Sequence, residues 1–434
     1  MVKLLKRYKV AIIPTLVIAT LSIALLTAAS FVAASIAKPN YIYTVDDLLK
    51  IRNNLSGYFV LKNNLDLSKI DNYEITGWIP IGDERNPFSG TFDANGYSIY
   101  NCKTNVDYLL QNAYKDSNTC YLGFFGYSTG TIIHTNLNSP SLSFLETTSA
   151  FDKTIWYGCI CGYNLGHITS SSVTYTNSSG TFKIDGINFG GVAGFNDGQL
   201  LRIKTINNLF LEINETSNCV GGIASSCGQH SVCKYIVKTG AISLSVKKDK
   251  EIIIGDLFGQ VSGGLFENIC SGSDVKQQYK PTLEIKNSST MTNAILGKFC
   301  GLVNVGENVQ IKNFYTESNT LFLNPCDNLS FGFMFGRNIS SNINISSSVL
   351  MGEGSFSKII GGNLGIVVGN NEIDSISASQ VYCCNASNVD DRFNLSFCEI
   401  KNPNEISLSN LGWPTNTSQG YWEKEGNRFC LKWV

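Results

Sequence analysis

One pattern of glycines recurs in the segments GCICGYNLG (residues 158–166) and GGVAGFNDG (residues 190–198). In both, three mostly apolar residues separate the first glycine from the second, and three further residues lead to a third. GDLFGQVSG at residues 255–263 repeats the pattern without a gap. Looser copies are centred on Gly126, Ser225, Gly301, Gly336 and Gly369. The central positions are separated by roughly 31 to 42 residues, the range of repeat architectures.

The two residues before each central position are apolar in every copy. These pairs are Phe124-Phe125, Ile160-Cys161, Val192-Ala193, Ile223-Ala224, Leu257-Phe258, Phe299-Cys300, Met334-Phe335 and Val367-Val368. We therefore expect a short strand that enters the core, followed by a turn at which glycine supplies a positive φ angle. Segments of alternating hydrophobicity follow, as at residues 201–206 and 309–314, and they predict strands with one buried face.

These patterns predict an all-β fold, a right-handed β-helix-like solenoid of glycine-rich repeats. One repeat cannot bury its apolar face alone, so neighbouring coils must stack. A short helix from Val45 to Ile51, capped by Thr44 with Asp47 in a weak capping box, is expected to cover an open end of the solenoid. The expected divisions are a cap with the first strands at 38–120, the repeats at 121–380 and a cysteine-rich closing unit at 381–434.

The first residues indicate export. Four basic residues lie within residues 1–9, and an uncharged, mostly apolar run fills residues 10–37. The run is longer than the about 20 residues that a helix needs to cross a membrane. We expect a transmembrane anchor with residues 1–9 in the cytoplasm and the body outside the cell. The alternative is a long signal peptide cleaved after Ala37, although such apolar cores usually span only about 7–15 residues.

Composition excludes some classes of function. Charged residues make up 15% of the chain, and the net charge is −1. The chain therefore lacks the basic surface that nucleic-acid binding requires. The hydrophobic fraction of 43% argues against disorder.

Fourteen cysteines agree with an oxidising compartment. Two pairs, Cys102 with Cys120 and Cys227 with Cys233, are close enough in sequence for local disulfides. A further group is placed to connect the last coil to the C-terminal segment: Cys383, Cys384, Cys398 and Cys430. Their connectivity cannot be deduced from the sequence.

Several segments resemble a known family. These are YTVDDL at 43–48, YFVLKNNLDL at 58–67, WIPIG at 78–82, FSGTFDANGYSI at 88–99, and near the end LGWP at 411–414 and LKW at 431–433. Together with the glycine repeats they resemble GLUG-motif proteins, a family of bacterial and protist surface proteins. The family includes adhesin-like proteins and the non-catalytic N-terminal region of IgA-specific metalloendopeptidases. The resemblance implies a β-helix-like solenoid with a role in attachment or surface display, and it supplies no catalytic residues.

Groups that could carry chemistry are few. The three histidines, His134, His167 and His230, share no position in the repeat and form no His-Glu-x-x-His motif, so we expect solvent-facing turn residues and no metal site. Cys161 and Cys300 occupy the slot that holds Phe, Ala or Val in other copies, which favours core filling over reactive thiols. No phosphate-binding loop is present.

Carboxylates could still serve a β-helix polysaccharide lyase or hydrolase if they gathered on one face. The candidates are Asp66, Asp83, Glu84, Asp93, Asp197 and Asp256. We expect capping and turn roles for them, with Asp93 in a turn ending at Gly96 and Asp256 exposed.

The sequence therefore predicts no catalytic, cofactor-binding or metal-binding residues. The expected function is that of a membrane-anchored surface solenoid in adhesion, ligand binding or display, with a host-cell, matrix or glycan ligand. Two alternatives stay open: a carbohydrate-active enzyme, and an architectural stalk or envelope protein that associates with itself.

Overall fold

The structure is a computed structural model that describes residues 38–143, 153–206, 208–213, 218–247, 251–272, 282–287, 291–323, 325–339, 341–351, 354–356, 359–372, 375–384, 393–394 and 396–432. The expected cytoplasmic segment and anchor, residues 1–9 and 10–37, lie outside the described residues. Among the residues that are described, no helix is long and apolar enough to cross a membrane.

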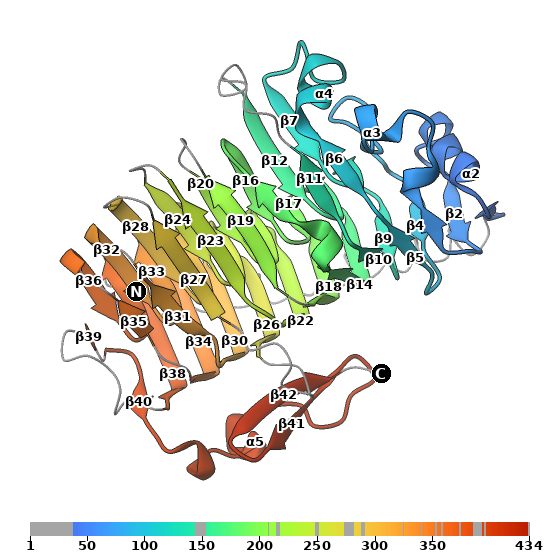
Figure 1. Ribbon diagram of the computed structural model, residues 1–434. Coiled ribbons are helices and arrows are strands. Elements are labelled where there is room, and N and C mark those ends of the chain that lie inside the picture. Colours follow the sequence, from blue (N-terminus) through green and yellow to red (C-terminus); the bar gives the residue numbers. More distant parts are fainter. Residues whose placement is uncertain are drawn as a thin grey trace, which may run out of the picture.

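The chain winds into a parallel β-solenoid in which each central coil contributes one strand to each of four sheets (Figure 1). One such coil consists of β12 (Thr154–Gly158), β13 (Cys161–Asn164), β14 (His167–Thr174) and β15 (Thr181–Lys183). We number the sheets 1 to 4 in this order. Every strand pair within these sheets is parallel. The predicted all-β solenoid is confirmed, whereas its right-handedness stays a prediction.

Sheets 1 and 2 meet at a corner within the glycine repeat, for example between Gly158 and Cys161. Sheet 1 contains β7 (Thr119–Leu122), β12, β16 (Ile187–Gly190), β20 (Asn218–Gly221), β24 (Ile252–Gly255), β28 (Met291–Gly297), β32 (Cys326–Gly332), β36 (Ile359–Gly365) and β39 (Phe393–Asn394). Sheet 2 contains β8 (Phe125–Ser128), β13, β17 (Ala193–Asn196), β21 (Ala224–Cys227), β25 (Phe258–Val261), β29 (Cys300–Val303), β33 (Phe335–Asn338) and β37 (Val368–Asn371).

Sheets 3 and 4 complete each coil. Sheet 3 contains β1 (Asn40–Ile42), β2 (Tyr58–Leu61), β3 (Leu65–Asp66), β4 (Thr91–Asp93), β5 (Ser98–Tyr100), β9 (Thr131–Ile133), β10 (Asn136–Asn138), β14, β18 (Gln199–Ile206), β22 (Val232–Lys238), β26 (Gly264–Ser271), β30 (Val309–Thr316), β34 (Ile343–Leu350), β38 (Ile376–Cys383) and β40 (Glu399–Ile400). Sheet 4 contains β15, β19 (Leu209–Ile213), β23 (Ile242–Val246), β27 (Thr282–Asn287), β31 (Asn319–Phe322) and β35 (Gly354–Phe356). Outside these sheets, β6 (Lys103–Asn105) pairs with β11 (Ser141–Ser143).

The register of sheet 2 matches the sequence repeat. Cys161 pairs with Phe125 on one side and Ala193 on the other. The equivalent residues of the later coils pair with one another in the same way. All sixteen residues of the predicted apolar pairs are buried, which confirms that they fill the core. The pair does not form one strand, however, because its first residue lies in the bend between sheets 1 and 2.

The central glycines of the repeat do not adopt the positive φ angle expected for turns. Gly162 and Gly194 lie inside extended strands of sheet 2 and outside the positive-φ region. A Cβ on Gly194 would lie 2.5 Å from the carbonyl oxygen of Gly162 in the preceding coil, and a Cβ on Gly162 would lie 2.6 Å from the backbone nitrogen of Leu122. Glycine is therefore required at Gly162 and Gly194, because adjacent coils approach too closely there for a side chain.

Each long strand of sheet 3 contains one non-glycine residue in the left-handed conformation. These residues are Ser170, Arg202, Tyr235, Asn268, Asn313, Ser347 and Gln380. The left-handed residue makes a bend in the strand. In β18 the buried side chains are those of Leu200, Ile203 and Thr205, whereas strict alternation would have buried Leu201. The predicted half-buried strands are thus present, with their alternation interrupted at the bend.

Helices are short in the part of the chain that the structure describes. They are α2 (Val45–Leu49), α3 (Tyr73–Thr76), α4 (Val106–Gln111) and α5 (Leu408–Leu411), with the 3₁₀ segments η1 (Lys50–Asn53), η2 (Leu67–Lys69), η3 (Asn177–Ser179) and η5 (Pro403–Glu405). The predicted capping box is confirmed, since Thr44 and Asp47 exchange hydrogen bonds at the start of α2. This helix covers one end of the solenoid (Figure 1) and buries Leu48.

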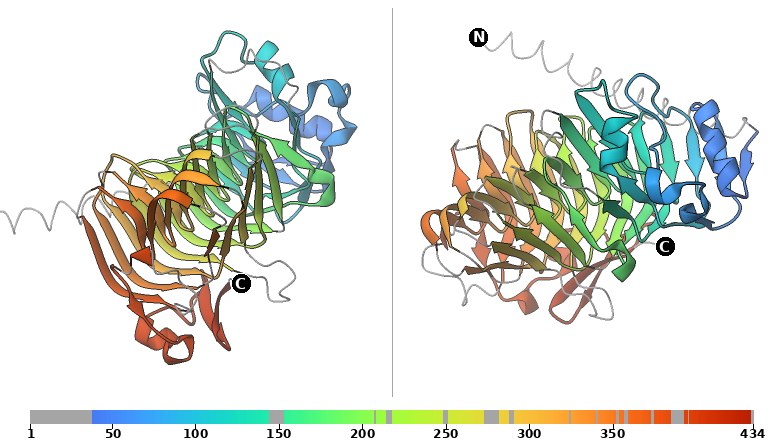
Figure 2. Two further views of the ribbon diagram at one scale, coloured as in Figure 1. Left: turned by 60° about the vertical axis from the view of Figure 1, so that its left-hand side comes forward. Right: turned by 45° about the horizontal axis from the view of Figure 1, so that its top comes forward.

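The C-terminal unit, residues 396–432, folds back along the outside of sheet 3 instead of only closing the last coil (Figure 2). It ends in an antiparallel hairpin of β41 (Tyr421–Glu425) and β42 (Arg428–Lys432). A second hydrophobic core joins outward residues of sheet 3 to this unit: Tyr235, Val237, Cys270, Tyr315, Val349, Met351, Cys384, Ile406, Leu411, Trp413, Trp422, Phe429 and Leu431. Arg428 adds a two-point ion pair with Glu317 at 2.8 and 2.9 Å.

The expected disulfides are not formed. All fourteen cysteines are free thiols, including the expected pairs Cys102 with Cys120 and Cys227 with Cys233. Cys383, Cys384, Cys398 and Cys430 are likewise unbonded, and the C-terminal unit is held by apolar packing and the Arg428 ion pair. Cys161 and Cys300 fill the core, as predicted.

Candidate functional site

Each of the carboxylates singled out in the sequence has its own hydrogen-bond or ion-pair partner, and five of the six lie in turns or at a helix cap. Asp66 caps η2 through Ser68 and accepts a hydrogen bond from Asn101. Asp93 accepts from the backbone N–H of Asn95 at 2.7 Å, which confirms the predicted turn. The remaining turn carboxylates, Asp83, Glu84 and Asp197, bond to Asn86, Tyr121 and His230 respectively. Within the described residues, no group of three or more His, Cys, Asp or Glu side chains could hold a metal ion.

Asp256 is buried, which corrects the expectation that it is exposed. Its side chain is 0% exposed and forms an ion pair with Lys238 at 2.7 Å. Ser271 donates a second hydrogen bond to it. A carboxylate that is enclosed and neutralised in this way has a structural role in the core, because an unpaired buried charge would be strongly destabilising.

The three histidines lie in different parts of the solenoid. His134 contacts Asp93 at 2.9 Å, and His230 contacts Asp197 at 3.0 Å; both rings are exposed. His167 begins β14 and is partly buried rather than solvent-facing, so burial lowers its pKa.

An aromatic row on the outer face of sheets 1 and 2 is the first feature that suggests binding. Tyr127, Tyr163 and Phe195 occupy the same position in three successive coils and stack in parallel. Their ring centroids are 4.8 and 4.4 Å apart. Trp156 of β12 packs edge-on against Phe195 at 5.4 Å, and Tyr121 of β7 packs edge-on against Tyr163 at 5.3 Å. We call these five residues the aromatic row.

The aromatic row combines apolar rings with protonated hydroxyl groups. Tyr127, Trp156, Tyr163 and Phe195 are half-buried, so each presents part of its ring to solvent. Burial, followed by the charges of neighbouring groups, raises the pKa of Tyr163 to about 12, and its hydroxyl stays protonated near neutral pH. The stack ends at Phe195, because Ser226 occupies the next position along the sheet.

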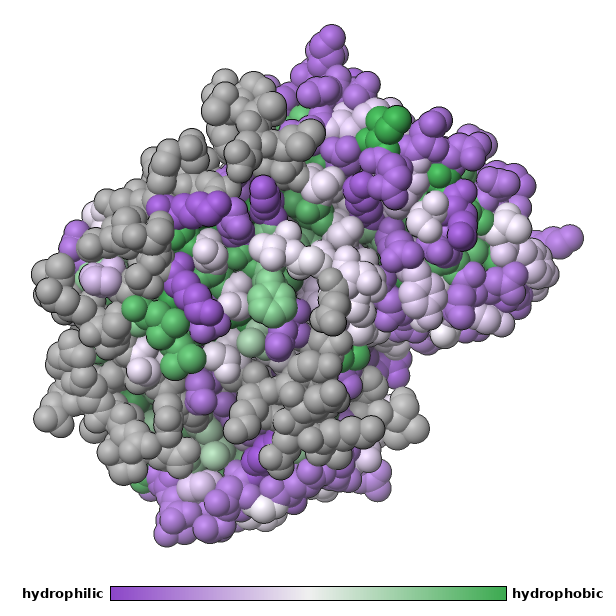
Figure 3. Space-filling view, viewed as in Figure 1, coloured by the Kyte–Doolittle hydropathy of each residue, from purple (hydrophilic) through white to green (hydrophobic). Residues whose placement is uncertain are grey.

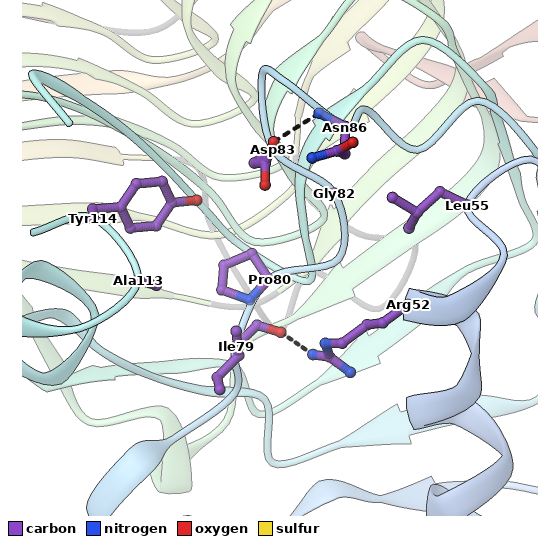
Figure 4. A pocket seen from close by; sticks show the side chains of 9 residues that line it. All are labelled: Arg52, Leu55, Ile79, Pro80, Gly82, Asp83, Asn86, Ala113 and Tyr114. Atoms are coloured by element: carbon purple, nitrogen blue, oxygen red, sulfur yellow. Dashed lines mark hydrogen bonds between the residues drawn. The ribbon is translucent and has the colours of Figure 1, made fainter. Parts of the chain in front are cut away.

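A pocket of about 370 Å³ lies at the N-terminal cap (Figure 4). Its walls come from three segments that are distant in sequence: Arg52 and Leu55 after α2, residues 79–86, and Ala113 with Tyr114 after α4. Arg52 donates a hydrogen bond to the carbonyl oxygen of Ile79, and its guanidinium lies 4.6 Å from the ring centroid of Trp78. Burial lowers the pKa of Arg52 to about 10.

The polar end of the pocket is formed by one loop. Oδ1 of Asp83 accepts hydrogen bonds from the backbone N–H groups of Arg85 and Asn86, at 2.8 and 2.7 Å. Figure 4 shows both side chains of this loop, Asp83 and Asn86, at the same end of the pocket, with Tyr114 and Leu55 on opposite sides. Neither Oδ2 of Asp83 nor the amide of Asn86 is hydrogen-bonded to a described residue.

The pocket and the aromatic row are neighbours. Between Asp83 and Asn86 in the same loop, Glu84 accepts a hydrogen bond from the hydroxyl of Tyr121 at 3.2 Å. Tyr114 of the pocket donates to the carbonyl oxygen of Tyr121 at 2.7 Å. The loop of the pocket and Tyr114 are therefore both in direct contact with Tyr121 of the row.

Sequence reasoning missed both features, although a signal for the row was present. The residue directly after the central glycine is aromatic in three consecutive copies, at Tyr127, Tyr163 and Phe195. The pocket has no such signal, because it is assembled from non-repeating segments.

The parallel sheets define the chain as a parallel β-solenoid. No protein-family model matches the chain, and no curated protein matches its sequence. Among solved structures, it is similar to one described as "a putative immunoglobulin A1 protease from Bacteroides ovatus", with 16% sequence identity, a TM-score of 0.40, and coverage of 92% of this chain and 93% of the other.

Proposed function

We propose that this chain is a non-catalytic, surface-displayed β-solenoid that binds glycan chains along the aromatic row. The observation that carries the proposal is the half-exposed stack of Tyr127, Tyr163 and Phe195, with Trp156 beside it. Aromatic rings provide a flat apolar surface, and tyrosine adds a polar hydroxyl at the edge of that surface. A sugar ring has the same two properties, an apolar face and polar hydroxyl groups around it.

The surroundings of the row favour a glycan over an apolar protein partner. Glu84 bonds to the hydroxyl of Tyr121, and the charge of Asp197 acts on Tyr163. These acceptors suit ligand hydroxyl groups. In the orientation of Figure 1, the space-filling view shows hydrophobic and hydrophilic side chains side by side over the central coils (Figure 3). Weak contacts repeated from coil to coil would provide affinity through multivalency.

Absence of catalysis is part of the proposal. Its support is that the candidate carboxylates are individually engaged in turns, in a cap and in the buried Lys238 ion pair. Surface display rests on the apolar run at residues 10–37 and on the resemblance to GLUG-motif surface proteins. N-terminal sequencing of the protein from a membrane fraction would distinguish a retained anchor from a cleaved leader.

The test uses residues 38–434 and a panel of labelled cello-, xylo-, manno-, galacto- and chito-oligosaccharides. We expect at least one of them to bind, and Phe195→Ala and Trp156→Ala to weaken that binding by about tenfold, equivalent to about 1.4 kcal/mol. Phe210→Ala is the matched control, because Phe210 is 49% exposed on sheet 4. Equal losses in all three variants, or no binding to any member of the panel, would overturn the proposal. Release of shorter sugars from a bound chain would replace it with the enzymatic alternative.

A further inference from the structure

Two exposed polar side chains line the pocket beside the aromatic row. Oδ2 of Asp83 and the side-chain amide of Asn86 line it without hydrogen bonds to described residues. A turn carboxylate needs only one oxygen for its backbone bonds, so the second oxygen of Asp83 is available to a ligand. The volume of about 370 Å³ falls in the usual range of small-molecule sites.

The charges in the pocket favour a neutral ligand that both donates and accepts hydrogen bonds. Arg52 and Asp83 contribute opposite charges, so the lining carries no net charge. An ionised carboxylate only accepts hydrogen bonds, whereas an amide both donates and accepts. A hydroxyl group satisfies both partners, because it can donate to Asp83 and accept from Asn86. An anionic ligand would be attracted by Arg52 and repelled by Asp83, so the lining gives it no net electrostatic advantage.

Apolar groups form the sides of the pocket. Leu55 and the ring of Tyr114 lie on opposite sides in Figure 4, with Pro80 between them. The hydroxyl of Tyr114 is held by the carbonyl oxygen of Tyr121, which fixes the ring in place. Arg52 is fixed in a similar way by Ile79 and Trp78. The walls are thus preorganised, so little side-chain ordering opposes binding.

From this geometry we infer that the pocket binds the terminal sugar of a glycan chain, a neutral pyranose with adjacent hydroxyl groups, while the rest of the chain lies on the aromatic row. Asp83 and Asn86 hold the hydroxyl groups of the terminal sugar. The loop of residues 83–86 connects the two parts, since Glu84 contacts Tyr121 of the row. The inference rests on the proposed function, and it adds a polarity to binding: one end of the glycan is recognised, and internal sugars are only stacked.

The experiment compares, for an oligosaccharide that binds, the intact chain with the same chain blocked at either end. The variants are Asn86→Ala and Asp83→Asn, the latter chosen because an amide oxygen can still accept the backbone bonds of the loop. We expect each variant, and blockage of one end of the sugar, to weaken binding by about tenfold. Thermal unfolding of the variants should be unchanged, which separates loss of binding from loss of folding.

Asn328→Ala serves as a control at an exposed asparagine of sheet 1, far along the solenoid. Binding that depends on Phe195 but not on Asn86, Asp83 or a free chain end would overturn the inference and leave the proposed function intact. Binding to no oligosaccharide in the panel would overturn both.

Discussion

Trp422 donates its indole N–H to Oδ1 of Asn268 at 3.0 Å, although the two residues are 154 positions apart. Asn268 is one of the left-handed residues of sheet 3, and the next of these, Asn313, donates to the same oxygen at 2.9 Å. Trp413 bonds in a similar way to the carbonyl oxygen of Ser347, another left-handed residue. The C-terminal unit therefore contacts the row of bends that runs along the solenoid, and its docking stabilises several coils at once.

We expect Trp422→Ala to destabilise the protein by about 3–5 kcal/mol, because a fully buried aromatic side chain and its hydrogen bond are lost. Denaturant unfolding, monitored by tryptophan fluorescence, would measure the loss of stability. Limited proteolysis would show which part of the chain opens first. Residues 396–432 should become sensitive to protease before the coils do. Phe210→Ala is the control, since it removes an exposed ring. An unchanged proteolysis pattern in Trp422→Ala would contradict the docking role of this unit.

The close approach of adjacent coils leads to a prediction for the repeat glycines. Gly194→Ala should severely reduce folding, since its Cβ would lie 2.5 Å from the oxygen of Gly162 and the backbone cannot move without disturbing the neighbouring coil. Gly272→Ala is the matched control, because the nearest atom to its Cβ would be the Sγ of Cys270 at 3.2 Å. The yield of soluble protein and its melting temperature would measure both variants. Equal effects would mean that coil spacing does not restrict position 194.

Much of the fold could be predicted because the repeat imposes one local constraint on every coil. The slot of Cys161 and Ala193 was visible in the sequence, and so was the capping box of Thr44 and Asp47. The sequence did not show why glycine occupies the central positions, because a positive φ angle and a close backbone approach both select glycine. The second core was also hidden. Tyr315 would be the exposed residue of an ordinary strand, and only the C-terminal unit, about a hundred positions later in sequence, buries it.

A buried asparagine ladder should stabilise the corner between sheets 2 and 3. Nδ2 of Asn164 donates to Oδ1 of Asn196 at 2.7 Å, and both side chains are 0% exposed. Asn196→Ala should cost about 1–3 kcal/mol, because it leaves a buried donor with a weaker set of partners. Asn328→Ala breaks a similar bond to Asn293 on the surface and should cost less than about 0.5 kcal/mol. Denaturation midpoints would compare the two, and similar losses would rule out a special role for the buried ladder.

His230 should titrate above its usual range. The hydrogen bond with Asp197, followed by the charge of Asp197, raises its pKa above 6.5. A raised folded-state pKa contributes stability below the unfolded pKa, and this contribution is lost as pH rises through the folded value. NMR of ¹³C-labelled histidine, assigned with His230→Gln, would measure the titration. Asp197→Asn should lower the pKa of His230, whereas an unchanged value would show that the contact does not persist in solution.

The buried thiols should resist chemical labelling in the folded protein. Burial raises the pKa of Cys159 and Cys161 to about 12, so the reactive thiolate form is scarce at pH 8. Cys398, the thiol with intermediate burial, should react first with Ellman's reagent, although burial also raises its pKa to about 12. After unfolding in guanidinium chloride without a reductant, all fourteen cysteines should react. A smaller number would mean that some of them are paired in disulfides, and mass spectrometry of peptides would identify which ones. Cys227 and Cys233 would be the first pair to inspect, because their side chains lie in the same coil and form a hydrogen bond.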